Sequence, residues 1–184
     1  MKGTTLLNEG KMRFVSGLPE ESIGLFSKAA EEGCNPVTVY LNRGAALIAL
    51  KRYQEAEDDF DRVLAIDTDN ERALYYRGIA HMLTGAYDEA ITDLTGALQR
   101  NHNRGVAFFA RGIANAEVGR EDAAVDDFRN AAVLSNVEVE GLMNLYGTNR
   151  SQFHRTLALL EGDRGPWKMV LNDSEVERLK QWLH

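Results

Sequence analysis

Glycine recurs at a fixed spacing of 34 residues, at Gly10, Gly44, Gly78 and Gly112. Three other columns keep the same step: a small residue, then a large apolar residue, then alanine or valine. Their members are Ser22, Ala56, Ala90 and Ala124; Phe26, Phe60, Leu94 and Phe128; Ala29, Val63, Ala97 and Ala131. A period of this length, kept in several columns over four copies, indicates a solenoid of stacked repeats.

Each repeat has the pattern of two helices. In the third repeat Leu74, Ile79 and Met82 are apolar at helical spacing, which predicts a first helix. The second helix begins with acids, as in Asp88-Glu89, and these suit the positive end of a helix dipole. Between the two helices a turn is predicted at Gly17, Lys51, Gly85 and Gly119.

These columns resemble the tetratricopeptide repeat family over residues 3–138. The second repeat reads Tyr40, Arg43-Gly44, Lys51, Tyr53, Ala56, Phe60 and Val63, and the third reads Leu74, Arg77-Gly78, Gly85, Tyr87, Ala90, Leu94 and Ala97. Arginine replaces the usual apolar residue before three of the glycines, and Pro19 and Ser22 stand where the family has Tyr and Ala. The resemblance implies an all-α, right-handed α-α superhelix whose first helices line a concave surface.

Four repeats are expected at 3–36, 37–70, 71–104 and 105–138. Beyond them the period decays, and residues 139–161 are expected to form a degenerate fifth helix pair. The Gly162–Pro166 stretch then ends any helix. Residues 162–184 are expected to be a C-terminal capping segment with a short final helix, because a solenoid needs an atypical unit over its last apolar face.

An aspartate follows each of three arginines by 16 residues: Arg43 and Asp59, Arg77 and Asp93, Arg111 and Asp127. In the first repeat both partners are absent, since these columns hold Glu9 and Leu25. We therefore predict bidentate ion pairs within each repeat. Pairing with the preceding repeat is less favoured, because Arg43 would then face Leu25. The alternative is that the arginines form a ligand-binding ladder.

The predicted concave surface is apolar and aromatic, which favours a protein or peptide partner with apolar anchor residues. Its expected groove residues are Leu7, Lys11, Phe14, Leu41, Asn42, Ile48, Arg72, Tyr75, Tyr76, Ile79, Met82, Phe109 and Ile113. Two other readings stay open: some of these side chains pack as core, or the chain's own C-terminus fills the groove. If the groove is open, changing Tyr75 and Phe109 to glutamate should abolish binding and leave the fold intact.

The resemblance also suggests a test for the family's carboxylate clamp. Counted from the first repeat, the positions of the clamp residues correspond to Leu7, Lys11, Asn42, Arg72 and Tyr76. Asn42 and Arg72 suit that chemistry, whereas Leu7 and Tyr76 do not. A chaperone carboxylate clamp is therefore not expected.

Composition excludes several other classes. The net charge is -7 and there is no dense basic run, which argues against nucleic acid. No apolar stretch approaches the roughly 18 residues of a membrane span. No signal-peptide core follows Met1, and the single Cys34 forbids an internal disulfide, so a cytoplasmic location is expected. The four histidines show no metal-ligand spacing.

The sequence thus predicts a protein-interaction module, an adaptor or scaffold, with no catalytic residues, no metal and no cofactor. The alternative is a self-assembling structural protein whose groove takes its own or a dimer mate's C-terminus, so a homodimer is possible. An enzyme is a third and less favoured reading.

Overall fold

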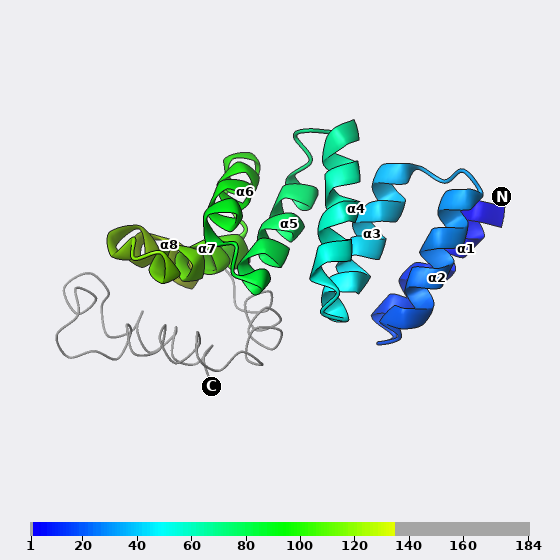
Figure 1. The fold of residues 1–184 in the computed structure, drawn as a ribbon, viewed down its shortest axis with the longest axis horizontal. Coiled ribbons are helices and arrows are strands. Elements are labelled where there is room, and N and C mark those ends of the chain that lie inside the picture. The colour runs from blue at the N-terminus through cyan, green and yellow to red at the C-terminus, as the bar shows by residue number, and fades with distance from the viewer. Residues whose placement is uncertain (1, 135–184) are drawn as a thin grey trace. The chain divides into compact units, whose positions relative to one another are not determined.

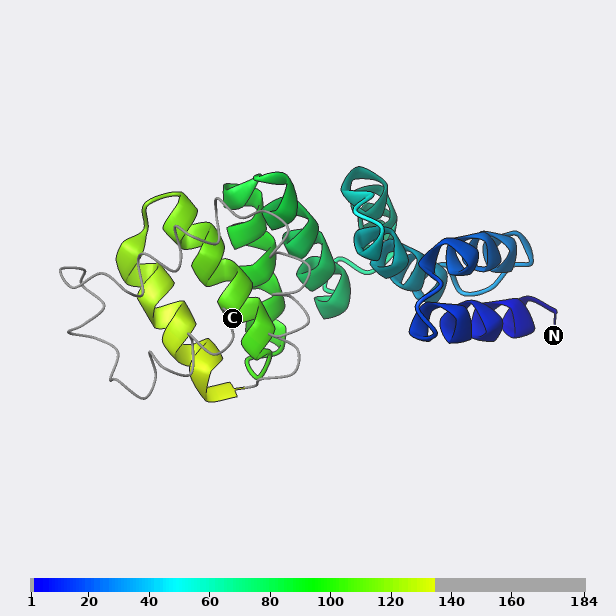
Figure 2. The same cartoon turned by 90° about the horizontal axis from the view of Figure 1, so that it is seen from below.

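The structure is a computed structural model and describes residues 2–134 (Figures 1 and 2). Helices and short turns account for this whole range, which contains no strand. The helices are α1 (Lys2–Val15), α2 (Pro19–Glu31), α3 (Pro36–Ala49), α4 (Tyr53–Ile66), α5 (Glu71–Thr84), α6 (Tyr87–Arg100), α7 (Gly105–Glu117) and α8 (Glu121–Leu134). The predicted fifth helix pair and the capping segment lie outside the described residues.

The chain divides into two compact units, Met1–Thr84 and Gly85–His184. In unit 1, α1 packs on α2, α3 on α4, and the pairs stack through α2 on α3 and α4 on α5. The first helices α1, α3 and α5 also contact one another in order. In unit 2, α7 packs on both α6 and α8. This alternation makes the chain an all-α helical-repeat solenoid, as the 34-residue period predicts. The unit boundary falls inside the predicted third repeat, between its two helices.

At three of the four glycines in the column, a phenylalanine of the same repeat occupies the space beside the glycine. A Cβ added to Gly10 or Gly44 would lie 2.6 Å from a ring carbon of Phe26 or Phe60. At Gly112 the distance to a Phe128 ring carbon would be 2.8 Å. These three rings are fully buried. The missing side chain therefore lets the two helices of a repeat close around one aromatic ring.

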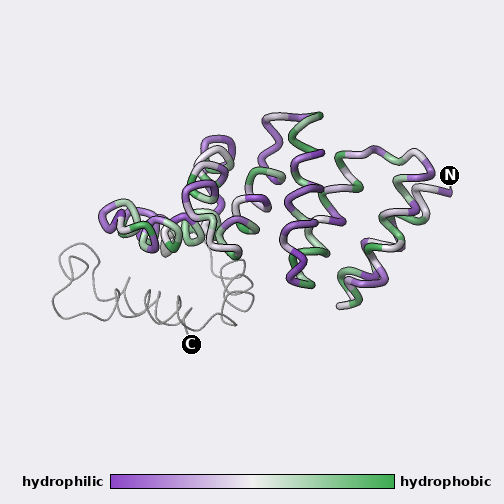
Figure 3. The backbone as a smooth tube through the Cα atoms, viewed as in Figure 1, coloured by the Kyte–Doolittle hydropathy of each residue, from purple (hydrophilic) through white to green (hydrophobic). Residues whose placement is uncertain are grey.

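Local sequence also sets where the helices begin and which side they bury. Pro19 and Pro36 stand in the first turns of α2 and α3, where a missing N–H does no harm. Asn35 caps α3 by accepting a hydrogen bond from the Thr38 amide at 3.1 Å. Along each helix the hydropathy alternates between polar and apolar sides (Figure 3). The apolar side faces the partner helix.

The turns inside the repeats need a left-handed residue. Gly17, Gly85 and Gly119 have φ of 76°, 86° and 78°. Lys51 occupies the same position with φ of 61°, the single non-glycine residue with positive φ in the described range. Its amide donates to the Ile48 carbonyl, and the next amide, of Arg52, donates to the Leu47 carbonyl. This is the Schellman arrangement that ordinarily uses glycine.

Replacing Lys51 with glycine is expected to stabilise the protein by up to about 1 kcal/mol. The left-handed conformation costs about 1–2 kcal/mol in a residue with a Cβ, and the greater freedom of glycine in the unfolded chain offsets part of the gain. Denaturant unfolding monitored by circular dichroism measures the change. Gly17→Ala is the matched control, because open space surrounds Gly17 and the backbone alone opposes the substitution. Gly17→Ala should destabilise the protein.

Candidate functional site

Most of the predicted groove side chains are buried. Eight of them expose less than a tenth of their surface: Leu7, Leu41, Ile48, Tyr75, Ile79, Met82, Phe109 and Ile113. An open apolar groove at these positions is therefore not what the structure presents. These eight residues pack in the hydrophobic core, which is the alternative that the sequence left open.

Their contacts explain the burial. Leu7 belongs to a cluster with Phe26, Ala29, Val39 and Ala46, to which both helices of the first repeat and the first helix of the second contribute. In unit 2 the ring of Phe109 lies 5.5 Å from that of Phe128, centroid to centroid. A first helix in a stack touches its own second helix as well as its neighbours, so less of its surface remains open than helical periodicity alone suggests.

The rings of the third repeat's first helix form a further contact chain. Tyr75 lies 4.9 Å from Tyr76, and Tyr76 stacks on Phe60 of α4 at 5.7 Å. Tyr75 is buried, whereas Tyr76 is half-buried. Tyr76 therefore keeps part of its side chain exposed while it stacks on the buried ring of Phe60.

The remaining predicted groove residues keep exposed surface, and all of them lie in unit 1. Lys11, Phe14, Asn42 and Tyr76 are half-buried and Arg72 is exposed. The Asn42 side-chain nitrogen donates to the Thr38 carbonyl at 2.6 Å, which leaves its amide oxygen free to accept. Lys11 and Arg72 form no ion pair among the described residues.

One exposed apolar residue on this surface was missed by sequence reasoning. Val15 follows Lys11 by one helical turn, so both lie on the same side of α1, and Val15 is 83% exposed. Arg72 and Tyr76 have the same spacing on α5. We call Lys11, Val15, Asn42, Arg72 and Tyr76 the first-helix face. The four-residue spacing from Lys11 could have predicted that Val15 lies on the same side of the helix.

Charge divides between the two kinds of helix in unit 1. The first helices α1, α3 and α5 carry six Lys and Arg residues against two acids. The second helices α2 and α4 carry eight acids against two basic residues. The first helices are thus net basic in a chain that is acidic overall.

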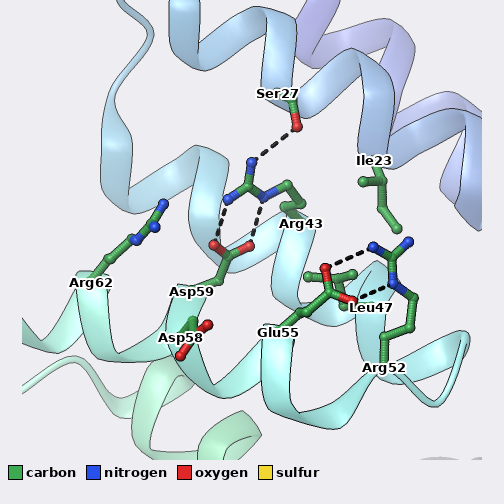
Figure 4. Close-up of a pocket in the computed structure, with 9 residues that line it drawn as sticks. All are labelled: Ile23, Ser27, Arg43, Leu47, Arg52, Glu55, Asp58, Asp59 and Arg62. Atoms are coloured by element: carbon green, nitrogen blue, oxygen red, sulfur yellow. Dashed lines mark hydrogen bonds and ion pairs between the residues drawn. The ribbon is translucent and has the colours of Figure 1, made fainter.

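Two of the three predicted ion pairs are present. Arg43 donates from Nε and Nη2 to the two carboxylate oxygens of Asp59, at 2.7 and 2.6 Å (Figure 4). Arg111 does the same to Asp127, at 2.9 and 2.6 Å. Arg77 and Asp93 belong to different units, and their pairing stays a prediction.

The arginines also bond to the preceding repeat, which the sequence reasoning judged less favourable. Arg43 Nη1 donates to Ser27 Oγ at 3.0 Å, and Arg77 Nη1 donates to Asp61 Oδ1 at 2.6 Å. The comparison with Leu25 considered the wrong column, since the acceptor lies two residues further along α2. The sequence could have predicted these bonds, because a residue that can accept a hydrogen bond stands 16 positions before each arginine.

Burial and pairing act against each other at these carboxylates. Burial raises the pKa of Asp127, while hydrogen bonds from Arg111 and Asn115 oppose that rise. The hydrogen bonds to Asp59 raise the pKa of Arg43, which therefore stays charged. Tyr40 adds a second contact to the cation, with its ring 5.3 Å from the Arg43 guanidinium. The arginines are held in place and are poor candidates for a ligand ladder.

A cavity of about 280 Å³ opens beside Arg43 between α2, α3 and α4 (Figure 4). Its lining residues are Ile23, Ser27, Arg43, Leu47, Arg52, Glu55, Asp58, Asp59 and Arg62. Arg52 donates from Nε and Nη2 to Glu55, both at 2.7 Å, just as Arg43 does to Asp59. Two of its three arginines are thus neutralised by carboxylates within the wall, which makes the cavity unsuited to binding an anion.

Within the part of the chain that the structure describes, no group of three His, Cys, Asp or Glu side chains is placed to hold a metal ion. None of the helices in that part has the length and apolar character to cross a membrane. Cys34 is half-buried and packs against the first-repeat cluster.

Helix pairs that recur every 34 residues define a helical-repeat protein. Residues 37–70, the second pair, match the family model described as "Tetratricopeptide repeat". The columns of this matched pair recur in the other described helix pairs, which supports a tetratricopeptide repeat protein. The comparison with curated proteins found no match.

Solved structures with the same fold include two forms of MamA. MamA 41-end from Desulfovibrio magneticus RS-1 has a TM-score of 0.69 and 18% identity, over 98% of this chain and 96% of that one. The MamA RS-1 ArsTM double mutant has a TM-score of 0.70 and 18% identity, over 98% and 95%. YrrB, described as a TPR protein with an unusual peptide-binding site, has a TM-score of 0.64 and 17% identity, over 84% and 74%. At these identities the likeness shows the fold, and the repeat class supports a protein-interaction module.

Proposed function

We propose that this chain is a protein-interaction module that binds a segment of a partner protein on the first-helix face of unit 1. The observation that carries the proposal is the pair of cations, Lys11 and Arg72, which lack an ion partner among the described residues. They lie on the net basic first helices, opposite in charge to the acidic second helices.

The face suits a short, extended segment that combines an acidic and an apolar side chain. Neighbouring packed helices are about 8–10 Å apart, so α1 to α5 spans roughly 20 Å, or about six residues of extended chain. Lys11 and Arg72 would attract carboxylates, while Val15 and the exposed part of Tyr76 offer apolar contact. The peptide-binding site named for YrrB supports a peptide ligand for this fold.

Reversing the two cations is expected to weaken peptide binding by about tenfold or more at low salt. Each charge pair near a protein surface contributes up to about 1 kcal/mol, and reversal adds repulsion. Peptides of twelve residues selected from a random displayed library against the wild-type chain serve as probes. Their affinities for wild type and for Lys11→Glu combined with Arg72→Glu are compared by fluorescence anisotropy.

Lys28→Glu is the matched control, because Lys28 is an exposed cation on the second helix α2 of the same unit. It should leave the affinity within about twofold. If the control weakens binding as much as the double change, overall charge rather than this face governs binding. If neither variant affects binding, the partner docks elsewhere.

Self-assembly through the C-terminus is the second candidate, favoured by the apolar and aromatic residues at Trp167, Val176, Leu179 and Trp182. Sedimentation velocity at several concentrations separates the two functions. A tight dimer that is lost on deletion of residues 165–184 supports self-assembly, and a monomer that retains the selected peptides supports the partner-binding module.

A further inference from the structure

A polar side chain stands 16 residues before each of the three arginines, in the column Ser27, Asp61 and Thr95. In every case Nη1 of the arginine donates to its oxygen: Arg43 to Ser27 at 3.0 Å, Arg77 to Asp61 at 2.6 Å, Arg111 to Thr95 at 3.0 Å. The acceptors lie on α2, α4 and α6, the second helices of the preceding repeats. Residue type varies along the column, but the ability to accept a hydrogen bond does not.

Arg43 and Arg111 therefore bond in two directions. One edge of the guanidinium, Nε with Nη2, is held by the aspartate of the same repeat, and Nη1 reaches back to the repeat before it. Both arginine side chains are 20% exposed, and the aspartates 2% and 4%. Hydrogen bonds shielded from water to this degree hold a defined geometry.

We infer that Arg43 and Arg111 connect each repeat to the one before it, in addition to pairing with the aspartate of their own repeat. The aspartate orients the guanidinium. The hydrogen bond from Nη1 then fixes the position of the preceding repeat's second helix relative to the arginine. An exposed ion pair accompanies this connection at the same two junctions. Arg52 and Arg120 each stand just before a second helix. They lie 3.4 Å from Glu20 and 2.8 Å from Asp88, which belong to the second helix of the preceding repeat.

Hydrogen exchange of the full-length chain, followed by mass spectrometry, tests the connection at Ser27. In a repeat array the stability of an end repeat depends on its own folding and on its interface with one neighbour. Ser27→Ala removes the acceptor and leaves the Arg43–Asp59 pair in place. Exchange in α1 and α2 should become about fivefold faster, the size expected for one hydrogen bond, while α3 and α4 stay within about twofold. Alanine is the better helix former, so helix propensity alone predicts the opposite change in α2.

The chain itself supplies two matched controls. Ser27→Thr reproduces the acceptor found at Thr95, and Ser27→Asp reproduces the one found at Asp61. Both should keep wild-type exchange in α1 and α2 within about twofold, or slow it.

Three outcomes would overturn the inference: unchanged exchange in Ser27→Ala, equal acceleration from α1 through α4, or the same acceleration in all three variants. Thr95→Ala repeats the test in unit 2 should the first variant fold poorly. There α6 should exchange faster while α7 and α8 do not, and uniform acceleration would count against the connection.

Discussion

Replacing Phe109 with glutamate is expected to unfold the helices of unit 2. The side chain has no exposed surface and its ring packs on Phe128. Truncation of a buried phenylalanine alone costs about 3–5 kcal/mol, and an unpaired carboxylate in its place adds a desolvation penalty of several more. That sum is comparable to the whole stability of a small domain. Loss of helical circular dichroism at 25 °C measures the effect.

The control is Arg72→Glu, which introduces the same carboxylate on an exposed first-helix position. It should retain wild-type helix content and a melting temperature within a few degrees. A folded Phe109→Glu chain would show that this position opens to solvent, and would restore the apolar groove that the sequence suggested.

Phe60→Ala is expected to lower the free energy of unfolding by about 3–5 kcal/mol. Phe60 is fully buried, stacks on Tyr76 and fills the space beside Gly44. Its removal loses the transfer free energy of the ring and leaves a cavity that the helices α3 and α4 cannot fully close. Urea unfolding followed by circular dichroism gives the difference.

A second substitution identifies the cause. Gly44→Ala in the wild-type chain places a Cβ at 2.6 Å from the Phe60 ring and should destabilise the protein by about 1–3 kcal/mol. In the Phe60→Ala background the same change meets open space, so its penalty should vanish or reverse. Additive effects of the two changes would mean that glycine is required for a reason other than this ring.

The fold was largely predictable from sequence because its determinants repeat. Gly44 and Phe60 stand 16 residues apart in one repeat and touch, and the same pair recurs as Gly10 with Phe26 and Gly112 with Phe128. A contact that recurs at a constant spacing is visible as a column. The Arg43–Asp59 pair was predictable in the same way, because both partners disappear together in the first repeat.

The candidate site was less predictable, since periodicity assigns a side to each residue without saying what covers it. Tyr75 and Tyr76 are neighbours on α5, yet the first is buried and the second is only half-buried. The repeat-to-repeat bonds were hidden for another reason. Ser27, Asp61 and Thr95 share one hydrogen-bonding role but no residue type, so a search for identical columns passes over them.

The two-way bonding of the arginines bears on how such an array changes length in evolution. Every internal repeat brings an arginine for the second helix before it and an acceptor for the arginine after it. Duplication or deletion of one 34-residue module therefore leaves each arginine with an acceptor in the repeat before it. The first repeat, with Glu9 in the arginine column, cannot take an internal place on these terms. Duplication that preserves these hydrogen bonds is thus expected among the repeats that carry the arginine, and not of the first repeat.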